Sequence, residues 1–397
     1  MEGVLVIVAP GQGAQAPGFL APWLELPHFE ERLRWLSACA GLDLIHYGTE
    51  ADADTIRDTA IAQPLLVGAG LVAALEIFPH PHDAFHAVGA ASGHSVGEIT
   101  AAAGTGVITA EQAMVLVRER GRAMADAAAR KPTGMTAVLG GDPDEVAAAL
   151  DRHGLTAANN NGSGQVVAAG TVDQLAAFAA DPPAKARLIA LSVAGAFHTE
   201  HMAPAVQTLA SYAKAVSVHD PRTTLISNRD GAVVQQGRDV LARIVSQVST
   251  PVRWDLCMRT MGELGVTGVI EVPPAGTLTG LIRRALPGVE TVALKTPDDI
   301  EAARDLAARH GSAAPQDGSP SWRMLVSPSK GTIRVVDLPE GTMLEPGTAV
   351  GTLVTSREEQ PVVAPHGGIV VEWLVEDGDP VSPGQPLIRL HPEGVPS

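Results

Sequence analysis

The stretch Gly93–Glu98, which reads GHSVGE, organises the rest of the chain. Its G-x-S-x-G spacing is typical of a sharp turn from a β-strand into a helix, and such a turn presents the hydroxyl of Ser95. Glycines at 93 and 97 suit the turn because a Cβ atom would crowd it. The apolar run 88–91 predicts the strand, and the alanine-rich run 99–103 predicts the helix. A helix N-terminus stabilises negative charge beside Ser95, although so short a pattern also arises by chance in a chain rich in glycine and alanine.

Composition narrows the class of protein. A chain of 397 residues is long enough for two or three domains, and 45% hydrophobic with 18% charged residues fits a protein with a buried core. The formal net charge of −16 argues against non-specific binding to nucleic acid or to an anionic membrane. The two cysteines, Cys39 and Cys257, show no metal-binding spacing and fit a reducing cytoplasm.

We expect no membrane attachment. The N-terminal apolar segment is short and lacks a basic start, so we interpret Val4–Ala9 as a buried β-strand and not as a signal peptide. We also expect no apolar run to reach the roughly 18 residues of a membrane span. The protein is therefore expected in the cytoplasm.

The segment PGQGAQ at 10–15 follows this first strand. It lacks the third glycine of a dinucleotide-binding loop. We interpret it as a glycine turn that brings Gln12 close to a reacting group. Further along, a helix is expected to begin at about Ile61, with Gln63 and Pro64 near its first turn, where a proline loses no hydrogen bond.

A helix is predicted over 110–128, and three arginines lie on it. Arg118, Arg120 and Arg122 cannot all share one face, because successive helical positions are about 100° apart. Each arginine is by default a solvated charge. The alternative is that one turns inward and binds a carboxylate, for which the planar guanidinium is well shaped.

The segment 128–196 is predicted to form a small inserted subdomain, because strands and helices alternate there. The expected strands are Met135–Leu139, Gln165–Ala169 and Ala186–Val193, and the expected helices are Pro143–His153 and Val172–Ala180. The cluster NNNG at 159–162 is expected to be a turn that faces solvent or a cleft.

A histidine follows the last of these strands, in the segment GAFHTEH at 195–201. His198 is a candidate general base for Ser95. His198 and His201 could instead face one metal ion, but no further ligand set is visible. A purely structural histidine is the third interpretation.

The chain changes character near its C-terminal end. A buried strand is predicted over Val266–Val272 and a last helix over Asp299–Ala308, and composition then predicts a linker at 309–322. Beyond the linker a repeat of 37 residues is visible: Val326 recurs as Val363, and glycines 331, 341 and 347 recur at 368, 378 and 384. Each half predicts strand–turn–strand–turn–strand, and the two halves predict a small β-sandwich over 323–392.

Taken together, residues 1–308 resemble the malonyl-CoA:acyl carrier protein transacylases. The motifs that carry the resemblance are PGQGAQ at 10–15, GHSVGE at 93–98, Arg120, GAFH at 195–198 and VSQVSTPVRW at 245–254. The resemblance implies an α/β-hydrolase-like large subdomain, an inserted ferredoxin-like small subdomain and an active site in the cleft between them. The chain departs from the family at Pro273 and Ala275, where glycines are more usual.

The resemblance implies acyl transfer through a covalent intermediate. Ser95 would attack malonyl-CoA and His198 would take its proton, after which the malonyl group would pass to the phosphopantetheine thiol of an acyl carrier protein. The backbone N–H of Val96 and a donor from Gln12 would form the oxyanion hole. The backbone carbonyl of Gln247 would orient His198.

The resemblance also implies a set of substrate-binding residues. Arg120 would hold the malonyl carboxylate, because an uncharged acyl group would leave the guanidinium buried and unpaired. Phe197 would crowd an α-methyl group and so favour malonyl over methylmalonyl. His94 and Gln63 complete this set, and neither a metal nor a cofactor is implied.

The segment 323–392 resembles biotinyl and lipoyl carrier domains. Such carriers place a modified lysine at a hairpin tip, and here that position is Arg357, which can be neither biotinylated nor lipoylated. We therefore expect an unmodified module that is used structurally or for docking to other synthase components.

Two other functions compete with malonyl transfer for a fatty acid or polyketide synthase. A serine esterase or thioesterase would share Ser95 and His198, but it would have no use for Arg120 and would need an acidic residue between serine and histidine in the chain. A scaffold protein with a vestigial acyltransferase is the second. Acyl carrier proteins are acidic, so a basic docking patch is expected, for which the candidates are Lys185, Arg187, Arg283 and Arg284.

Overall fold

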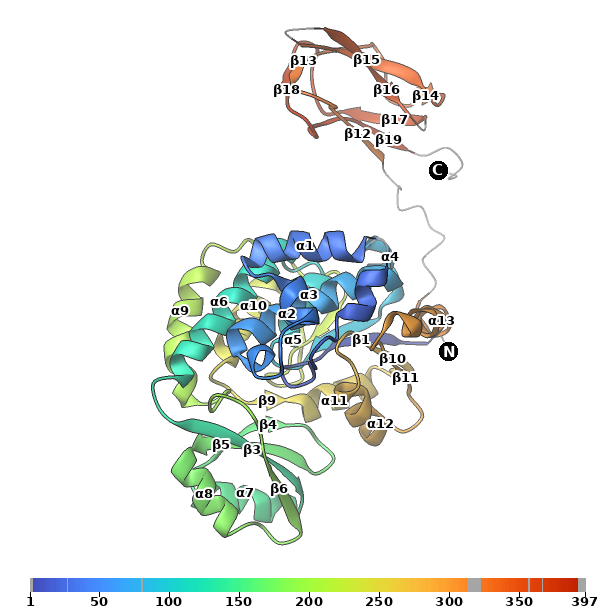
Figure 1. Ribbon diagram of the computed structural model, residues 1–397. Coiled ribbons are helices and arrows are strands. Elements are labelled where there is room, and N and C mark those ends of the chain that lie inside the picture. Colours follow the sequence, from blue (N-terminus) through green and yellow to red (C-terminus); the bar gives the residue numbers. More distant parts are fainter. Residues whose placement is uncertain are drawn as a thin grey trace. The chain divides into compact units, whose positions relative to one another are not determined.

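The computed structural model describes residues 3–391, apart from Pro27, His80, 313–322, Ser356, Arg357 and His366. The chain forms two compact units, Met1–Ala314 and Pro315–Ser397 (Figure 1). The first unit combines a largely parallel sheet, covered by helices, with a smaller α/β subdomain, and the second unit consists of β-strands. The predicted fold class is confirmed.

The large sheet of the first unit positions the site. Its order is β11 (Glu290–Ala293), β10 (Gly268–Glu271), β1 (Leu5–Ala9), β2 (Ala90–Gly93), β7 (Thr224–Ile226) and β8 (Val233–Val234). The first five strands run parallel and β8 is antiparallel to β7. In β1, Leu5 belongs to the core on one face, whereas Val6 and Val8 belong to the core on the other. The strand is apolar throughout because helices cover both faces of the sheet.

Helices make up most of the rest of this subdomain. They are α1 (Phe29–Ala40), α2 (Leu44–Thr49), α3 (Thr59–Ile77), α4 (Pro81–Ala87), α5 (Gly97–Gly104), α6 (Ala110–Ala128), α9 (Ala203–Ala213), α10 (Gly237–Gln247), α11 (Trp254–Glu263), α12 (Thr277–Ala285) and α13 (Ile300–His310). Short 3₁₀ turns are η1 (Ala21–Glu25), η2 (Thr55–Arg57), η3 (Glu200–Met202) and η4 (Pro297–Asp299). The last helix continues two residues past the predicted boundary at 308.

Helix α3 corrects two expectations. It begins at Thr59, where the side chain of Asp58 accepts the N–H of Ala60, so Pro64 lies inside the helix and past its first turn. The helix has 19 residues and a mean hydropathy of 1.8 over an apolar window that is 67% buried. The expectation that no apolar run reaches membrane-spanning length is therefore wrong. Helix α3 packs against α1, α5 and α6. Its apolar composition follows from this packing, because a helix that is covered on several sides is apolar around its whole circumference.

The small subdomain has the predicted ferredoxin-like order. Its elements are β3 (Thr133–Gly140), α7 (Pro143–Arg152), β4 (Thr156–Asn160), β5 (Gln165–Thr171), α8 (Val172–Ala180) and β6 (Ala186–Ala190). The strands pair in the order β6-β3-β5-β4, and α7 and α8 cover one face of the sheet (Figure 1). Strand β4 was not predicted, since alanine and asparagine are weak strand formers.

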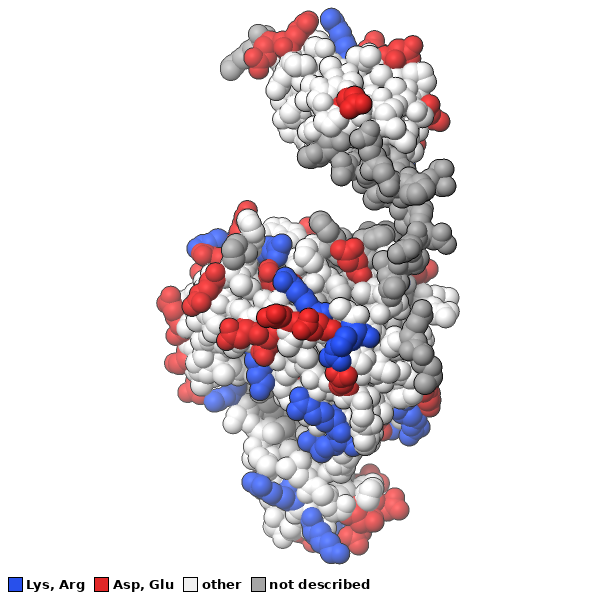
Figure 2. Space-filling model, turned by 90° about the vertical axis from the view of Figure 1, so that its right-hand side faces the viewer, with Lys and Arg blue, Asp and Glu red and all other residues white. Residues whose placement is uncertain are grey.

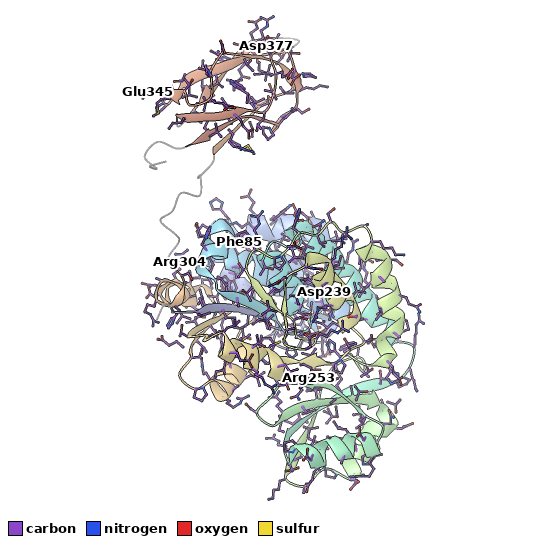
Figure 3. All side chains as sticks on the ribbon, turned by 180° about the vertical axis from the view of Figure 1, so that it is seen from behind. Phe85, Asp239, Arg253, Arg304, Glu345 and Asp377 are labelled. Atoms are coloured by element: carbon purple, nitrogen blue, oxygen red, sulfur yellow. The ribbon has the colours of Figure 1, made fainter. Side chains whose placement is uncertain are left out.

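A short strand from the large subdomain extends the small sheet. Residues Val252 and Arg253 form β9, which pairs in parallel with β4. Figure 3 shows Arg253 between α11 and the small sheet. Its guanidinium binds the carboxylate of Asp255, 2.7 Å away, and its N–H donates to the carbonyl of Asn228 at 2.6 Å. The two subdomains therefore share backbone pairing beside the site.

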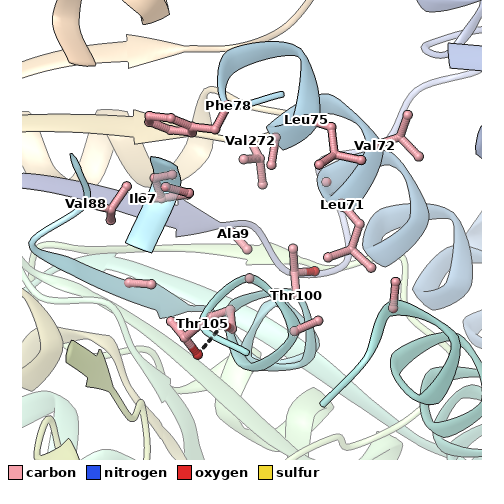
Figure 4. A pocket seen from close by; sticks show the side chains of 18 of the residues that line it. Ile7, Ala9, Leu71, Val72, Leu75, Phe78, Val88, Thr100, Thr105 and Val272 are labelled. Carbon is pink, nitrogen blue, oxygen red and sulfur yellow. Dashed lines mark hydrogen bonds between the residues drawn. The ribbon is translucent and has the colours of Figure 1, made fainter. Parts of the chain in front are cut away.

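A largely apolar pocket of about 320 Å³, open to the surface, lies between α3, β1 and α5. Leu71 of α3, Ile7 of β1 and Thr100 of α5 are among the residues that line it (Figure 4). None of the residues predicted for the site lines this pocket.

The second unit is a two-sheet sandwich with internal symmetry. Its strands are β12 (Arg323–Val326), β13 (Gly331–Val335), β14 (Met343–Leu344), β15 (Thr348–Val354), β16 (Glu359–Ala364), β17 (Gly368–Trp373), β18 (Pro380–Val381) and β19 (Pro386–His391). One sheet has the order β12-β19-β17-β14 and the other β16-β15-β13-β18. A shift of 37 residues maps the first sheet onto the second.

This symmetry refines the prediction for the second unit. Each half contributes four strands and not the three expected, and each sheet takes two strands from each half. The halves therefore interleave and share one apolar core, which includes Ile333 and its repeat partner Val370. Arg357, the predicted replacement of the carrier lysine, lies outside the described residues.

Candidate active site

The turn that carries Ser95 joins β2 to α5. The backbone of Ser95 has φ +53°. A Cβ atom on Gly93 would lie 2.0 Å from the carbonyl carbon of Gly97, and a Cβ atom on Gly97 would lie 2.2 Å from the carbonyl oxygen of Ala9. Both glycines are therefore required by backbone contacts, and the turn predicted from the GHSVGE stretch is confirmed.

His198 is placed to accept the proton of Ser95. Its Nε2 lies 2.8 Å from the Oγ of Ser95, and its Nδ1 lies 2.8 Å from the carbonyl oxygen of Gln247. A carbonyl oxygen only accepts, so Nδ1 carries the hydrogen and Nε2 presents its lone pair to the serine hydroxyl. The N–H of His198 also donates to the carbonyl of Val248 at 3.0 Å, which fixes the backbone at φ +62°.

Arg120 is the arginine of α6 that turns inward. Its side chain is 1% exposed. Nη1 donates to Oε1 of Gln63 at 2.7 Å, and Nη2 donates to Oε1 of Gln247 at 2.7 Å and to Oγ of Ser95 at 3.2 Å. Among the described residues, the buried Nε has no hydrogen-bond partner. The guanidinium thus lies against the hydroxyl of Ser95 and keeps unused donor capacity.

The side chain of Gln247 connects Arg120 to residues that the sequence did not predict. Its Nε2 donates to a carboxylate oxygen of Glu98 and lies 2.9 Å from Oδ1 of Asn228 and 3.1 Å from the carbonyl oxygen of Ser95. Asn228 in turn donates its side-chain amide to the carbonyl of Gly93 at 2.8 Å. A signal for Glu98 existed in the sequence: it is an acidic residue inside an otherwise apolar helix start, directly after the serine turn.

Burial and charge set the protonation states of the site. Burial, and next the positive charge of Arg120, lower the pKa of His198 from 6.5 to about 3. Burial lowers the pKa of Arg120 to about 10, against the opposing charge of Glu98. Burial raises the pKa of Glu98 to about 7, while hydrogen bonds from Asn228 and others oppose the shift. At neutral pH the imidazole is therefore neutral and the guanidinium charged.

Two backbone donors remain free near the serine turn. Val96 is the N-cap of α5, and within the described chain its N–H and that of Gln12 have no protein acceptor. The side-chain amide of Gln12 donates instead to the carbonyl of Arg57 at 3.1 Å. Its backbone N–H is thus the donor that Gln12 keeps available.

A groove of about 480 Å³ lies next to the serine turn, between the two subdomains. Gln12 and His94 line it from the large subdomain, and Asn161 lines it from the small one. The Nε2 of His94 lies 3.0 Å from Oδ1 of Asn161. The predicted NNNG cluster therefore faces this groove at Asn161. Phe197, by contrast, is 6% exposed, packs in the core, and does not line the groove.

The metal interpretation finds no support in the geometry. Within the described part of the chain, no three or more His, Cys, Asp and Glu side chains are grouped to hold a metal ion. His198 and His201 do not form a metal site, because the two ring nitrogens of His198 already contact Ser95 and Gln247.

Known proteins are similar to this chain in sequence. Residues 6–303 match the family described as the acyl transferase domain. The malonyl CoA-acyl carrier protein transacylase of Mycobacterium bovis is 49% identical over 298 residues, which are 75% of this chain and 98% of that protein. The chain belongs to the malonyl CoA-acyl carrier protein transacylase family. It is therefore an acyltransferase.

Solved structures agree with this membership. The crystal structure of MCAT from Mycobacterium tuberculosis aligns with a TM-score of 0.73 and 47% identity, over 76% of this chain and 99% of that one. A malonyl-transacylase in complex with its type II PKS acyl-carrier protein aligns with a TM-score of 0.71 and 28% identity, over 76% and 99% of the two chains. The family match ends at residue 303, before the second unit.

Proposed function

We propose that this chain transfers a malonyl group from malonyl-CoA to the phosphopantetheine thiol of an acyl carrier protein. The observation that carries the proposal is the buried guanidinium of Arg120, 3.2 Å from the hydroxyl of Ser95, beside an oriented neutral histidine. A nucleophile next to a buried cation suits an acyl group that carries its own carboxylate.

The reaction follows from the geometry in two half-reactions. Ser95 gives its proton to Nε2 of His198 as its oxygen bonds to the thioester carbonyl carbon. The carbon–sulfur bond then breaks, the thiol of CoA leaves with the proton from His198, and the malonyl ester remains on Ser95. The carrier thiol next gives its proton to His198 and its sulfur bonds to the ester carbonyl carbon. The carbon–oxygen bond to Ser95 then breaks, and Ser95 recovers the proton from His198.

The oxyanion of each tetrahedral intermediate needs donors. We assign them to the backbone N–H of Val96, at the N-terminus of α5, and to the backbone N–H of Gln12. The charge of the helix end adds to their effect. Loss of one such donor lowers the rate by about 10²–10³ in other enzymes.

Substrate selection is assigned to the residues around Arg120. Its free donor capacity would bind the malonyl carboxylate, while Gln63 and Gln247 hold the guanidinium in place. An acetyl group would leave this buried cation without a charged partner, and buried unpaired charges are strongly unfavourable. Phe197 precedes the base in the chain but packs in the core, so no contact with the groove supports its predicted role against an α-methyl group.

The alternatives fit these contacts less well. An esterase triad would place a carboxylate on Nδ1 of His198, whereas here that nitrogen faces the carbonyl of Gln247. A vestigial scaffold would not need His198 and Arg120 both to contact the hydroxyl of Ser95. We also propose that the enzyme acts in the cytoplasm without a metal or cofactor, for a fatty acid or polyketide synthase.

The docking surface for the carrier protein is proposed on charge alone. On the face seen in Figure 2, Lys and Arg side chains of the first unit lie among Asp and Glu side chains. We propose the candidates Lys185, Arg187, Arg283 and Arg284, because the carrier is acidic. The second unit is proposed to dock to other components of the synthase.

The test uses radiolabelled malonyl-CoA and a holo acyl carrier protein. Malonyl transfer predicts label on the protein first and on the carrier after its addition. Rapid release of free malonate without transfer would favour the hydrolase, and an unlabelled protein would favour the scaffold.

A further inference from the structure

The carboxyl group of Glu98 lies beneath the site and points at the amide that holds Arg120. Glu98 is 5% exposed. One of its oxygens accepts the N–H of Asn228 at 2.6 Å, and the other accepts the side-chain amide of Gln247. The charge of Arg120 acts on Glu98 across this amide. The three side chains therefore form a chain of hydrogen bonds in which Gln247 is the bridge.

We propose that Glu98 is a positioning residue for malonyl recognition, because it fixes the amide of Gln247 that in turn holds Arg120. The inference rests on the proposed function and names a residue that selects the acyl group at the same site. Glu98 does not touch Ser95 through its side chain, so it acts through Gln247 and not on the reacting atoms.

The direction of the Gln247 amide is the feature that Glu98 controls. Its oxygen accepts from Nη2 of Arg120 at 2.7 Å, and its nitrogen donates to Glu98. A reversed amide would place an NH₂ group against a guanidinium and a carbonyl oxygen against a carboxylate, and both contacts would be repulsive. The donating guanidinium at one end and the accepting oxygen of Glu98 at the other thus select one orientation.

The same residue also holds the base. The backbone carbonyl of Gln247 accepts from Nδ1 of His198 at 2.8 Å, at the C-terminal end of α10. Movement of Gln247 would therefore change the position of Arg120 first and, through the backbone, that of His198 second. A positioning role for Glu98 predicts a larger effect on malonyl recognition than on the chemistry of an uncharged acyl group.

Substitution by glutamine distinguishes positioning from space filling. In Glu98→Gln the shape is kept, but one acceptor oxygen becomes a donor. The N–H of Asn228 and the amide of Gln247 both require an acceptor there, so one of them loses its partner. Glu98→Asp keeps two acceptors on a shorter side chain.

The experiment measures kcat and KM of the full chain for malonyl-CoA and acetyl-CoA. Each rate is divided by the amount of protein whose Ser95 can be labelled. We expect Glu98→Gln to raise KM for malonyl-CoA about tenfold, the factor associated with one hydrogen bond to a charged group, and to lower the malonyl-to-acetyl ratio. For Glu98→Asp, both the KM for malonyl-CoA and the malonyl-to-acetyl ratio should lie between the values of this variant and those of the wild type. The matched control is Glu119→Gln. Glu119 is 8% exposed, adjoins Arg120 in sequence and pairs with Arg118 at 2.7 Å. The malonyl-to-acetyl ratio of this variant should equal that of the wild type.

The outcomes separate this inference from the function on which it rests. A wild-type KM and ratio in Glu98→Gln would overturn the positioning role, even if the variant is less stable. If Glu98→Gln does not fold, Glu98→Asp decides: a raised KM supports the role, and a wild-type KM and ratio overturn it. Absence of label on wild-type Ser95 would instead overturn the proposed function.

Discussion

Nη2 of Arg120 lies 3.2 Å from Oγ of Ser95. An acyl group on this oxygen would therefore lie within reach of a buried cation. Arg118 on the same helix instead pairs with Glu119 at 2.7 Å. Of the arginines considered on α6, Arg120 is thus the one assigned to the substrate.

The first prediction concerns acyl selection. Arg120→Ala should lower kcat/KM for malonyl-CoA by about a hundredfold, the factor that corresponds to roughly 3 kcal/mol for a desolvated charge pair. Acetyl transfer should persist or increase, because the unpaired cation is gone. Steady-state rates with the two thioesters check this, with Arg118→Ala as the control. An unchanged preference for malonyl would remove the clamp assignment.

The second prediction concerns pH. Burial and the charge of Arg120 lower the pKa of His198 to about 3, so the imidazole stays in its basic, neutral form as the pH falls below 7. Acylation of the wild type by acetyl-CoA should therefore show no loss from this histidine between about pH 5 and 7. Arg120→Ala removes one cause of the lowered pKa. The pH at which the acylation rate falls on the acid side should therefore rise toward 6.5.

Rapid-quench measurements of Ser95 acylation across this pH range check the second prediction. The prediction would be contradicted if the wild-type acylation rate fell on the acid side with a midpoint near pH 6.5 and if Arg120→Ala did not change that midpoint.

The third prediction concerns the serine turn. Gly93→Ala and Gly97→Ala should fail to accumulate as folded protein, because the new Cβ atoms would lie 2.0 and 2.2 Å from backbone atoms. Gly104→Ala, at the end of α5, is the control, since nothing lies within 4 Å of its added Cβ atom. It should change the free energy of unfolding by no more than about 1 kcal/mol. Soluble yield and thermal unfolding are the measurements, and a folded, active Gly93→Ala would show that the turn is wrongly described.

Much of this fold could be predicted because its signals are local. The turn at Gly93–Glu98 and the helices α7 and α8 follow from glycine positions and from the spacing of apolar residues. Strand β4 could not be found this way, since its Ala and Asn residues become a strand only through pairing with β5. In the second unit the repeat was visible, but the exchange of strands between halves depends on long-range pairing that no local pattern encodes.

The site residues also divide into those with a local signal in the sequence and those that depend on distant partners. Ser95, Arg120 and His198 lie in short motifs, and each motif suggests its chemistry. Glu98 was missed because a glutamate in the first turn of a helix normally faces solvent. Its burial depends on Asn228 and Gln247, which are more than a hundred positions away in the chain.

The fourth prediction concerns the second unit. A chain that ends at Ala314 should keep the malonyl transfer rate of the full chain, because the family match ends at residue 303 and the first unit has its own core. Transfer to isolated carrier protein and thermal unfolding of the first unit check this. A large loss of transfer by the shortened chain would show that residues 315–397 contribute to catalysis.

In the proposed transfer, Ser95 carries the malonyl group between donor and acceptor. Mass spectrometry of peptides from the full chain, after brief exposure to malonyl-CoA without carrier protein, tests it most directly. We expect one malonyl group on the peptide that contains Ser95, none in Ser95→Ala, and loss of the group when holo acyl carrier protein is added. A malonyl group on another residue, or transfer that persists in Ser95→Ala, would contradict it.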